Sequence, residues 1–432
     1  MPRYLNNTIW VLIEKFFRLI ASLFIGIMVT RFLGPEKFGL LSYAVGVASI
    51  FASFSSLGFD ITLVKRFSSY CSDENEIIGT ALVLRFLSTL LSTLILIIVM
   101  LTLNKSDELM TIFILIGAAS FLNSFNVIDL IFQAKVKSIY VVRIFIVQIV
   151  ASSSLRLVLI YYGSSVEMFA SVLVLEAVIY STGLIFSYRA YITNNIKWKF
   201  RNSTARKLLV EGLPYIFSGL AISIYLKIDV IMIQEMIDSE AVGIYSAANR
   251  LTEASYFIPT AIIGSLFPLL VRLRNQSSEE FYEAMSAISG GLVVLAVSLA
   301  LIISTFGEHI ILLLYGEDFL LSAQVLAIHT WAAIFVFLGM ISHRWYVIEM
   351  KPTLALRRSM EGLLINMVLN YFLIPIYGIA GAATATLLGH MYVGFISDFL
   401  YPSTRKLFYT KLAGVVSFLA LLFKYMDAKI EK

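Results

Sequence analysis

The sequence has little charge, one cysteine and few prolines. Lys, Arg, Asp and Glu make up 14% of its 432 residues, against 59% hydrophobic residues. A mean hydropathy of +0.87 excludes an ordinary soluble protein, because too little polar surface is available to face water. With Cys71 as the only cysteine, an intramolecular disulfide is excluded. Helix packing and backbone hydrogen bonds therefore have to stabilise the fold.

Signatures of enzymes and of metal sites are also missing. No Walker-type phosphate loop and no Gly-x-Ser-x-Gly elbow occurs, which removes the usual signs of an ATPase or a serine hydrolase. The histidines fall in four separate segments without metal-ligand spacing: His309, His329, His343 and His390. We therefore expect a protein that is not an enzyme and that holds neither a metal ion nor a cofactor.

What the sequence does contain is a series of apolar runs along its whole length. Each is long enough to cross a hydrocarbon core about 30 Å thick as a helix, and none alternates as barrel strands do. We predict an all-α membrane protein with about 12 transmembrane helices. The predicted helices are 9–31, 38–58, 77–103, 109–133, 139–162, 167–189, 208–233, 241–269, 282–306, 322–348, 356–376 and 378–400. A last segment, 408–425, either spans, lies in the interface or packs on the outside.

Basic residues predict the orientation, because Lys and Arg accumulate in cytoplasmic loops. With the N-terminus in the cytoplasm, about 20 of them fall on the cytoplasmic side and about 3 outside. The predicted external turns 234–241 and 307–318 carry Asp and Glu without Lys or Arg. The pI near 9.0 therefore follows from topology, and we expect no nucleic-acid partner.

Two pairs of matching stretches indicate an internal repeat. Residues 34–44 (GPEKFGLLSYA) align with residues 238–248 (DSEAVGIYSAA), and Tyr162-Gly163 corresponds to Tyr377-Gly378. Two halves of six helices insert the same way up, which predicts a parallel repeat of two lobes around a central cavity. The expected domains are an N-terminal lobe with a basic cytoplasmic linker (1–205), a C-terminal lobe (206–401) and a tail or extra helix (402–432).

Basic side chains inside the predicted helices are the candidates for substrate binding. Each costs a few kcal/mol in the membrane unless it faces a cavity or a partner. Arginine suits phosphate because its planar group donates two parallel hydrogen bonds. Cations at two depths are suited to hand an anionic headgroup from one leaflet to the other. The candidates are Arg18 and Arg85, nearer the cytoplasm, and Arg156, Lys227 and Arg250, nearer the outer side.

Two acidic residues are candidates for ion coupling. A carboxylate in the membrane can bind H⁺ or Na⁺ in one conformation and release it in another, and Asp229 and Glu253 have suitable positions. The alternative is that the charges only neutralise each other. Glu14 with Arg18, and Arg250 with Glu253, stand at helical spacing for such pairs, and Asp229 balances Lys227.

Two motifs carry a resemblance to a known family. Residues 30–44 (TRFLGPEKFGLLSYA) and 369–386 (LNYFLIPIYGIAGAATAT) resemble the polysaccharide-biosynthesis branch of the multidrug/oligosaccharidyl-lipid/polysaccharide (MOP) exporter superfamily, the Wzx-type O-antigen flippases. Locally, Gly34 and Pro35 suit a tight turn, with the glycine in the left-handed region. Gly378, Gly381, Ala382 and Ala383 let two helices approach closely. We interpret the second motif as a packing feature.

The resemblance implies an activity. Such proteins flip undecaprenyl-pyrophosphate-linked repeat units from the cytoplasmic to the periplasmic leaflet by alternating access of two six-helix lobes. It implies a cationic cavity to which the first helix contributes, and Arg18 is the position that matches. It further implies a location in the bacterial inner membrane, membrane lipids as surroundings, and polysaccharide polymerase and chain-length proteins as partners.

Two alternatives stay open. A drug or cation exporter of the same superfamily is the nearest, although the helix-borne cations suit an anion better. A membrane-embedded polysaccharide polymerase or transferase shares the composition. It generally needs a sizeable extramembrane loop, and the longest predicted external connection, about 16 residues, is within ordinary loop lengths.

Overall fold

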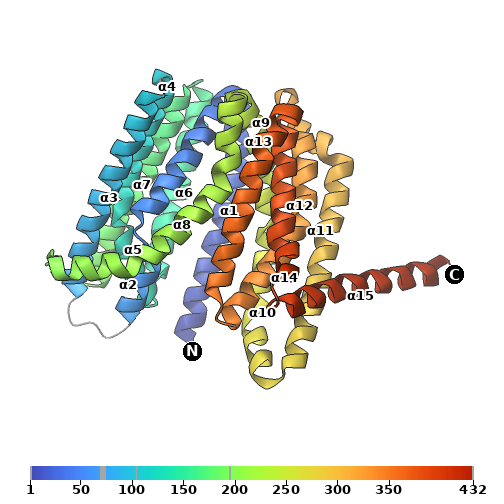
Figure 1. Cartoon of the computed structure of the whole chain (residues 1–432). Coiled ribbons are helices and arrows are strands. Elements are labelled where there is room, and N and C mark those ends of the chain that lie inside the picture. The colour runs from blue at the N-terminus through green and yellow to red at the C-terminus, as the bar shows by residue number, and fades with distance from the viewer. Residues whose placement is uncertain (1, 69–73, 104, 194–195, 431–432) are drawn as a thin grey trace. The chain divides into compact units, whose positions relative to one another are not determined.

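The computed structural model describes residues 2–68, 74–103, 105–193 and 196–430, and these residues form helices and connections without any strand. Cys71 lies outside the described residues. The chain divides into two compact units, which we call unit 1 (Met1–Lys227) and unit 2 (Ile228–Lys432). Figure 1 traces the helices through both. The domain boundaries expected from the sequence stay a prediction.

Unit 1 consists of seven α-helices, a 3₁₀ turn (η1) and the first part of α8. In chain order these are α1 (Pro2–Ser55), α2 (Phe59–Ser68), α3 (Glu74–Thr102), α4 (Asp107–Leu122), η1 (Asn123–Asn126), α5 (Val127–Ala134), α6 (Ile139–Tyr161), α7 (Val166–Tyr191) and α8 (Asn202–Met236). The long helices α3, α4, α6 and α7 run alongside one another (Figure 1). α8 contains Pro214, whose missing N–H breaks one helical hydrogen bond.

Unit 2 continues from the last part of α8. Its elements are α9 (Ser239–Ser255), α10 (Phe257–Gln276), α11 (Ser278–Leu314), η2 (Glu317–Phe319), α12 (Ser322–Ile348), α13 (Pro352–Met391), a π-helical turn η3 (Tyr392–Ile396), α14 (Ser397–Leu400) and α15 (Arg405–Ile430). The longest of these helices, α11, α12 and α13, pack against one another in chain order.

The described residues include ten helical stretches that are long and apolar enough to cross a membrane. Two of them, Ile13–Ser55 and Pro352–Leu400, are 43 and 49 residues long, whereas one crossing needs about 20. Non-helical glycines, Gly34 in α1 and Gly378 in α13, divide these stretches into two limbs each. The protein is therefore an all-α, multi-pass membrane protein, with limbs that correspond to the helices expected from the sequence.

The glycines of the two motifs have the geometry that the sequence predicts. Gly34 has φ 72° and Gly378 has φ 58°, a left-handed backbone that glycine adopts without the steric cost of a Cβ. A Cβ added to Gly381 would lie 2.2 Å from the carbonyl oxygen of Leu373, so only glycine permits this approach. The predicted turn and the predicted close contact are both confirmed.

The predicted helix 109–133 is interrupted in the structure. Asn123, Ser124 and Asn126 form the turn η1 between α4 and α5. Short polar side chains of this kind compete with the helical backbone for hydrogen bonds, which the apolar length of the segment concealed. Ser181 of α7 stabilises the break by donating to the carbonyl oxygen of Leu122 at 2.7 Å.

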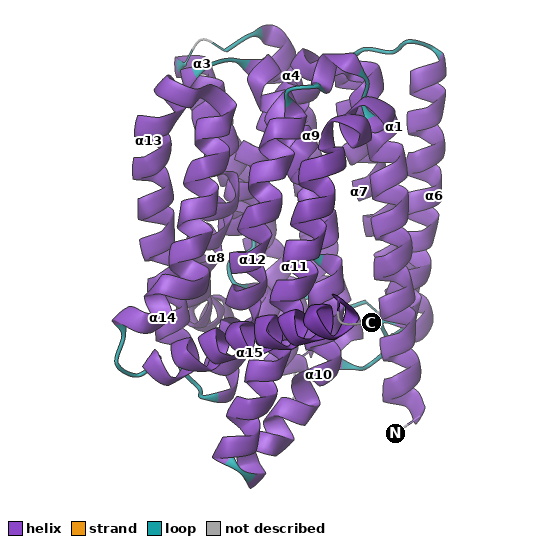
Figure 2. Cartoon of the chain, turned by 90° about the vertical axis from the view of Figure 1, so that its right-hand side faces the viewer, coloured by secondary structure: helices purple, strands orange, loops and turns teal. Residues whose placement is uncertain are grey.

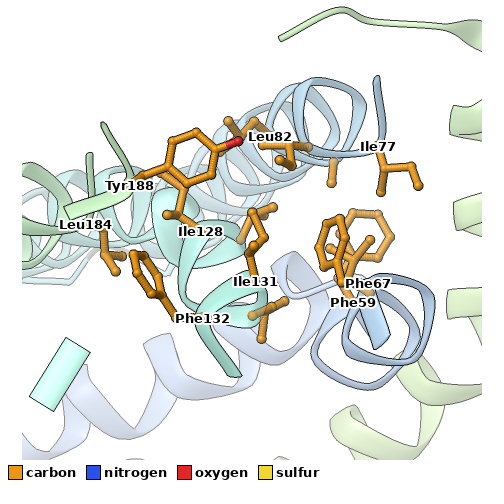
Figure 3. Close-up of a cluster of buried hydrophobic side chains, with 14 of the residues drawn as sticks. Phe59, Phe67, Ile77, Leu82, Ile128, Ile131, Phe132, Leu184 and Tyr188 are labelled. Atoms are coloured by element: carbon orange, nitrogen blue, oxygen red, sulfur yellow. The ribbon is translucent and has the colours of Figure 1, made fainter. Parts of the chain in front are cut away.

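A buried core joins the short helices of unit 1 to its long ones. Phe59 and Phe67 of α2 lie beside Ile77 of α3, and Leu82 of α3 together with residues of α5 and α7 completes the cluster (Figure 3). Helix α2 was not predicted from the sequence, because the segment is short and carries charged residues, and only one of its faces is apolar. Burial of that face fixes the position of the polar residues that α2 carries.

Segment 408–425 lies in α15, and its relation to the membrane stays a prediction. This helix is not among the ten membrane-length stretches of the described residues, and it runs across α11 instead of along it (Figure 2). Lys411 of α15 is fully buried and forms an ion pair with Asp398, which Arg358 also contacts at 3.3 Å. Gly414 allows the contact with α11, since a Cβ there would lie 2.0 Å from the Ser286 carbonyl oxygen.

Candidate functional site

A cavity of about 530 Å³ lies within unit 1 beside Arg18, and we call it the Arg18 cavity. Its walls come from the first limb of α1, from α5 and from the start of α6. The lining residues are Glu14, Lys15, Arg18, Asp129, Gln133, Ser138, Val141, Val142 and Phe145. α1 packs on α6, and α6 contacts α5, which brings these residues together from segments far apart in the chain.

Arg18 is paired but accessible. Its guanidinium forms an ion pair with Glu14 at 2.5 Å, one helical turn earlier, and stacks over the Phe145 ring at 4.0 Å. The Arg18 side chain is 46% exposed, whereas that of Glu14 is 6% exposed. The pair that the sequence suggested is thus present. It uses one side of the guanidinium, which leaves further N–H donors free to bind an anion.

Asp129 is a wall residue that was not among the candidates predicted from the sequence. Its carboxyl group accepts hydrogen bonds from Gln133 at 3.0 Å and from the Tyr180 hydroxyl at 3.2 Å. Asp129 is 8% exposed. The signal was available, because Asp129 is an ionisable residue inside the predicted helix 109–133, and the cost of burying a charge applies to it as to Arg18.

A second cavity of unit 1, about 190 Å³, surrounds Arg85, and we call it the Arg85 cavity. Arg85 of α3 is 5% exposed and forms an ion pair with Asp60 of α2 at 2.6 Å. It also donates to the Ser56 carbonyl oxygen at 3.3 Å. Arg18 and Arg85 therefore line separate cavities, although the sequence placed both near the cytoplasm.

Asp229 of α8 lies in a polar cluster inside unit 2. The Asp229 carboxylate accepts hydrogen bonds from Asn370 at 2.6 Å, from Thr386 at 2.7 Å and from Tyr245 at 2.9 Å. It is 7% exposed. Within the described residues it forms no ion pair, so its neighbours hold a buried carboxylate by neutral donors alone.

The Asp229 cluster gives the motif 369–386 a second role beside packing. The packing role that the sequence pattern favoured is present at Gly381, and Asn370 and Thr386 of the same motif bind Asp229 directly. Both residues are neutral. The cost of burying a charge marks Asp229 in the sequence, but it does not mark the amide and the hydroxyl that hold it.

The remaining candidates are distributed over several helices. Arg156 of α6 is neutralised by Glu176 of α7 at 2.8 Å. Lys227 and Arg250 are half-buried, on α8 and α9. Glu253 is exposed and accepts a hydrogen bond from Asn249 at 3.0 Å. Of the two ion-coupling candidates, only Asp229 has a built environment of donors.

Comparison with known sequences gives three findings. Residues 4–274 match the model of a family described as polysaccharide biosynthesis protein. The chain is 27% identical over 237 residues to Agl15 of Haloferax volcanii, a probable low-salt glycan biosynthesis flippase. This matched region covers 53% of this chain and 49% of the relative. It is 22% identical over 400 residues to the capsular polysaccharide biosynthesis protein CapF of Staphylococcus aureus, with 92% and 98% covered. The chain thus spans about half the length of the Haloferax flippase and nearly all of CapF.

Comparison with solved structures identifies the fold. An inward-facing multidrug resistance MATE transporter of the MOP superfamily superposes with a TM-score of 0.71 at 17% identity, covering 90% of this chain and 94% of the other. The lipid II flippase MurJ in an inward closed conformation gives 0.69 at 15% identity, covering 96% and 92%. At these identities the likeness shows that the chain shares the fold of these two proteins.

Proposed function

Because this chain belongs to the polysaccharide biosynthesis protein family, we propose that it is a flippase for a lipid-linked oligosaccharide. The substrate is an undecaprenyl-pyrophosphate-linked repeat unit of O-antigen or a similar surface polysaccharide. It moves from the cytoplasmic to the outer leaflet of the cytoplasmic membrane by alternating access of the two lobes. The description of Agl15 as a probable flippase of glycan biosynthesis supports this proposal.

The observation that carries the proposal is the Arg18 cavity. A pyrophosphate cannot cross hydrocarbon unaided, because the free energy of transferring an unpaired charge into an apolar medium is strongly unfavourable. Arg18 offers free guanidinium donors beside a volume of about 530 Å³, and Lys15 adds a second cation to the same wall. Glu14 and Asp129 balance the two cations but are buried, whereas Arg18 is exposed, so the site binds an anion without trapping it.

We assign ion coupling to Asp229. A buried carboxylate without a cationic partner is unfavourable by several kcal/mol unless it takes up a proton or a cation. The Asn370 side-chain oxygen is buried without a hydrogen-bond partner, and it belongs to the same amide that donates to Asp229. Na⁺ prefers such oxygen ligands, and H⁺ is the alternative ion. Glu253, exposed on α9, is the weaker candidate.

The test is transport by purified protein in liposomes. A fluorescent undecaprenyl-pyrophosphate-linked sugar is incorporated, and its appearance in the other leaflet is followed by quenching with a membrane-impermeant reductant. We expect Arg18→Ala to lower the initial rate about tenfold or more, because a hydrogen bond to a charged group is worth about 1.5–3 kcal/mol. Arg189→Ala, at an exposed cation in the last turn of α7, is the matched control and leaves the rate unchanged.

The outcomes separate the alternatives. Equal rates for wild type and Arg18→Ala would remove the Arg18 cavity from the path. Wild-type liposomes that do not move the lipid, yet extrude a cationic dye along an H⁺ or Na⁺ gradient, would replace the flippase by the drug-exporter alternative. Elongation of the glycan by the purified protein would instead indicate a polymerase or transferase.

A further inference from the structure

We propose that the Arg85 cavity is a docking site for one uncharged sugar ring of the transported glycan. This proposal rests on the proposed function and adds a second subsite to it. The cavity lies where the second limb of α1, α2, α3 and η1 meet, and the core of Figure 3 holds α2 and α3 in place. Its polar wall residues include Ser55, Asp60, Arg85, Ser120, Asn123 and Asn126.

Several polar groups of this wall have hydrogen-bonding capacity that the protein itself does not use. Arg85 uses one terminal nitrogen for Asp60 and for the Ser56 carbonyl, while its Nε is buried without a partner. Asn126 accepts from Tyr180 at 3.0 Å, which leaves its amide NH₂ as a donor. The side chains of Ser120 and Asn123 are half-buried and exposed, respectively, so both are accessible from the cavity. The wall therefore presents several donors and acceptors side by side.

The mixture of donors and acceptors decides the class of ligand. A sugar hydroxyl both donates and accepts, as the Ser and Asn side chains do, so each can pair with the other. A phosphate only accepts, and the Asp60 carboxylate, 57% exposed, would repel it. An apolar chain would leave the wall groups unpaired, at about 1–3 kcal/mol each.

Charge and volume agree with this choice. The pairing of Arg85 with Asp60 at 2.6 Å makes the site close to neutral, and the carboxylate is the exposed member of this pair. Beside Arg18 the exposed member of the pair is the cation. A volume of about 190 Å³ has room for a single ring and too little for a whole oligosaccharide. The two cavities of unit 1 thus divide the substrate, with the pyrophosphate beside Arg18 and one neutral ring beside Arg85.

The test compares probes that differ only in the sugar. The probes are short-chain prenyl pyrophosphates, either bare or carrying one glucosyl, galactosyl or N-acetylglucosaminyl group. Each probe is titrated into the whole chain in nanodiscs, and its binding is measured by calorimetry. We expect at least one sugar-bearing probe to bind wild type about tenfold more tightly than the bare probe. The double variant Ser120→Ala, Asn123→Ala should abolish this gain and leave the affinity for the bare probe unchanged, since two neutral hydrogen bonds amount to about tenfold.

Controls separate a lost contact from a damaged fold. Ser154→Ala, at an exposed position of α6, is the matched substitution and keeps the full preference for the sugar. The single variant Asn123→Ala changes an exposed side chain and should lose about half of the gain in free energy.

Three results would each contradict the sugar subsite, and the third would also contradict the proposed function. If no sugar-bearing probe binds wild type better than the bare one, the Arg85 cavity holds water only, and the flippase proposal survives. If the double variant weakens every probe equally, Ser120 and Asn123 are structural. If wild type binds no probe at all, the proposed function fails and this subsite with it.

Discussion

In unit 1 each of the two cavities has an ion pair with one exposed member, whereas the charges of the Asp229 and Asp398 clusters in unit 2 are enclosed. Arg18 is 46% exposed and Asp60 is 57% exposed, although their partners are buried. Asp229 is 7% exposed, and Asp398 and Lys411 are 0% exposed. An exposed charge beside a cavity can exchange its partner for a ligand, while an enclosed carboxylate without a cationic partner, such as Asp229, favours uptake of a small ion. We therefore propose headgroup and sugar binding for unit 1 and ion binding for unit 2.

The largest expected effect is on the enclosed ion pairs of unit 2. Asp398→Asn leaves Arg358 and Lys411 buried beside each other without their common anion. Loss of one partner of a buried pair costs about 3–5 kcal/mol, so we expect a clearly lower unfolding temperature of the detergent-solubilised protein. Arg357→Gln, which removes an exposed pair with Glu361, should not change it. Equal melting of all three proteins would contradict the difference between open and enclosed charges.

Asp229→Asn tests the assignment of ion binding. The amide preserves the size of the side chain but cannot bind a proton or balance a cation. We expect coupled transport in the liposome assay to fall about 10- to 100-fold, and the gradient of H⁺ or Na⁺ to lose its effect on the rate. The bare prenyl pyrophosphate should bind as before, because its site lies in unit 1. A variant that still responds to the gradient would move ion coupling elsewhere.

Asp60→Asn and Arg85→Met break the same ion pair, but we expect them to destabilise the protein by different amounts. The first leaves a cation that is 5% exposed without its anion, at about 2 kcal/mol. The second leaves a carboxylate that water already reaches, so its cost should be smaller, about 1 kcal/mol from lost packing. Unfolding temperatures measured in one detergent check the order. A greater loss for Arg85→Met would show that packing outweighs charge at this site.

The smallest effects are expected at two glycines that the predicted repeat aligns. Gly163 of unit 1 and Gly378 of unit 2 correspond in the sequence repeat, have φ of 65° and 58°, and face open space. Alanine at Gly163 should cost about 1–2 kcal/mol through backbone strain alone. Gly378 has ψ −138°, a conformation that is essentially restricted to glycine, so we expect alanine to lower the unfolding temperature more there than at Gly163. Equal losses would contradict this difference between the two turns.

Much of the fold follows from sequence patterns. Apolar length and the positions of glycine and proline give the helices and the turns at Gly34 and Gly378, because lipid admits no unpaired backbone. The helix α2 and the break at η1 do not follow from these patterns. The first depends on burial of a single face against α3 and α5, and the second on hydrogen bonds of Asn126 and Leu122 with α7.

By itself the sequence determined that this is a multi-helix membrane protein with buried charges and a family motif, since apolar runs and the cost of a charge in lipid are local properties. Only the tertiary structure decided which charges are paired. It placed Arg18 and Arg85 in separate cavities and surrounded Asp229 with Asn370, Thr386 and Tyr245. The physical reason is that a partner's identity depends on which helices pack together, and neutral donors such as Asn370 carry no cost that marks them in a sequence.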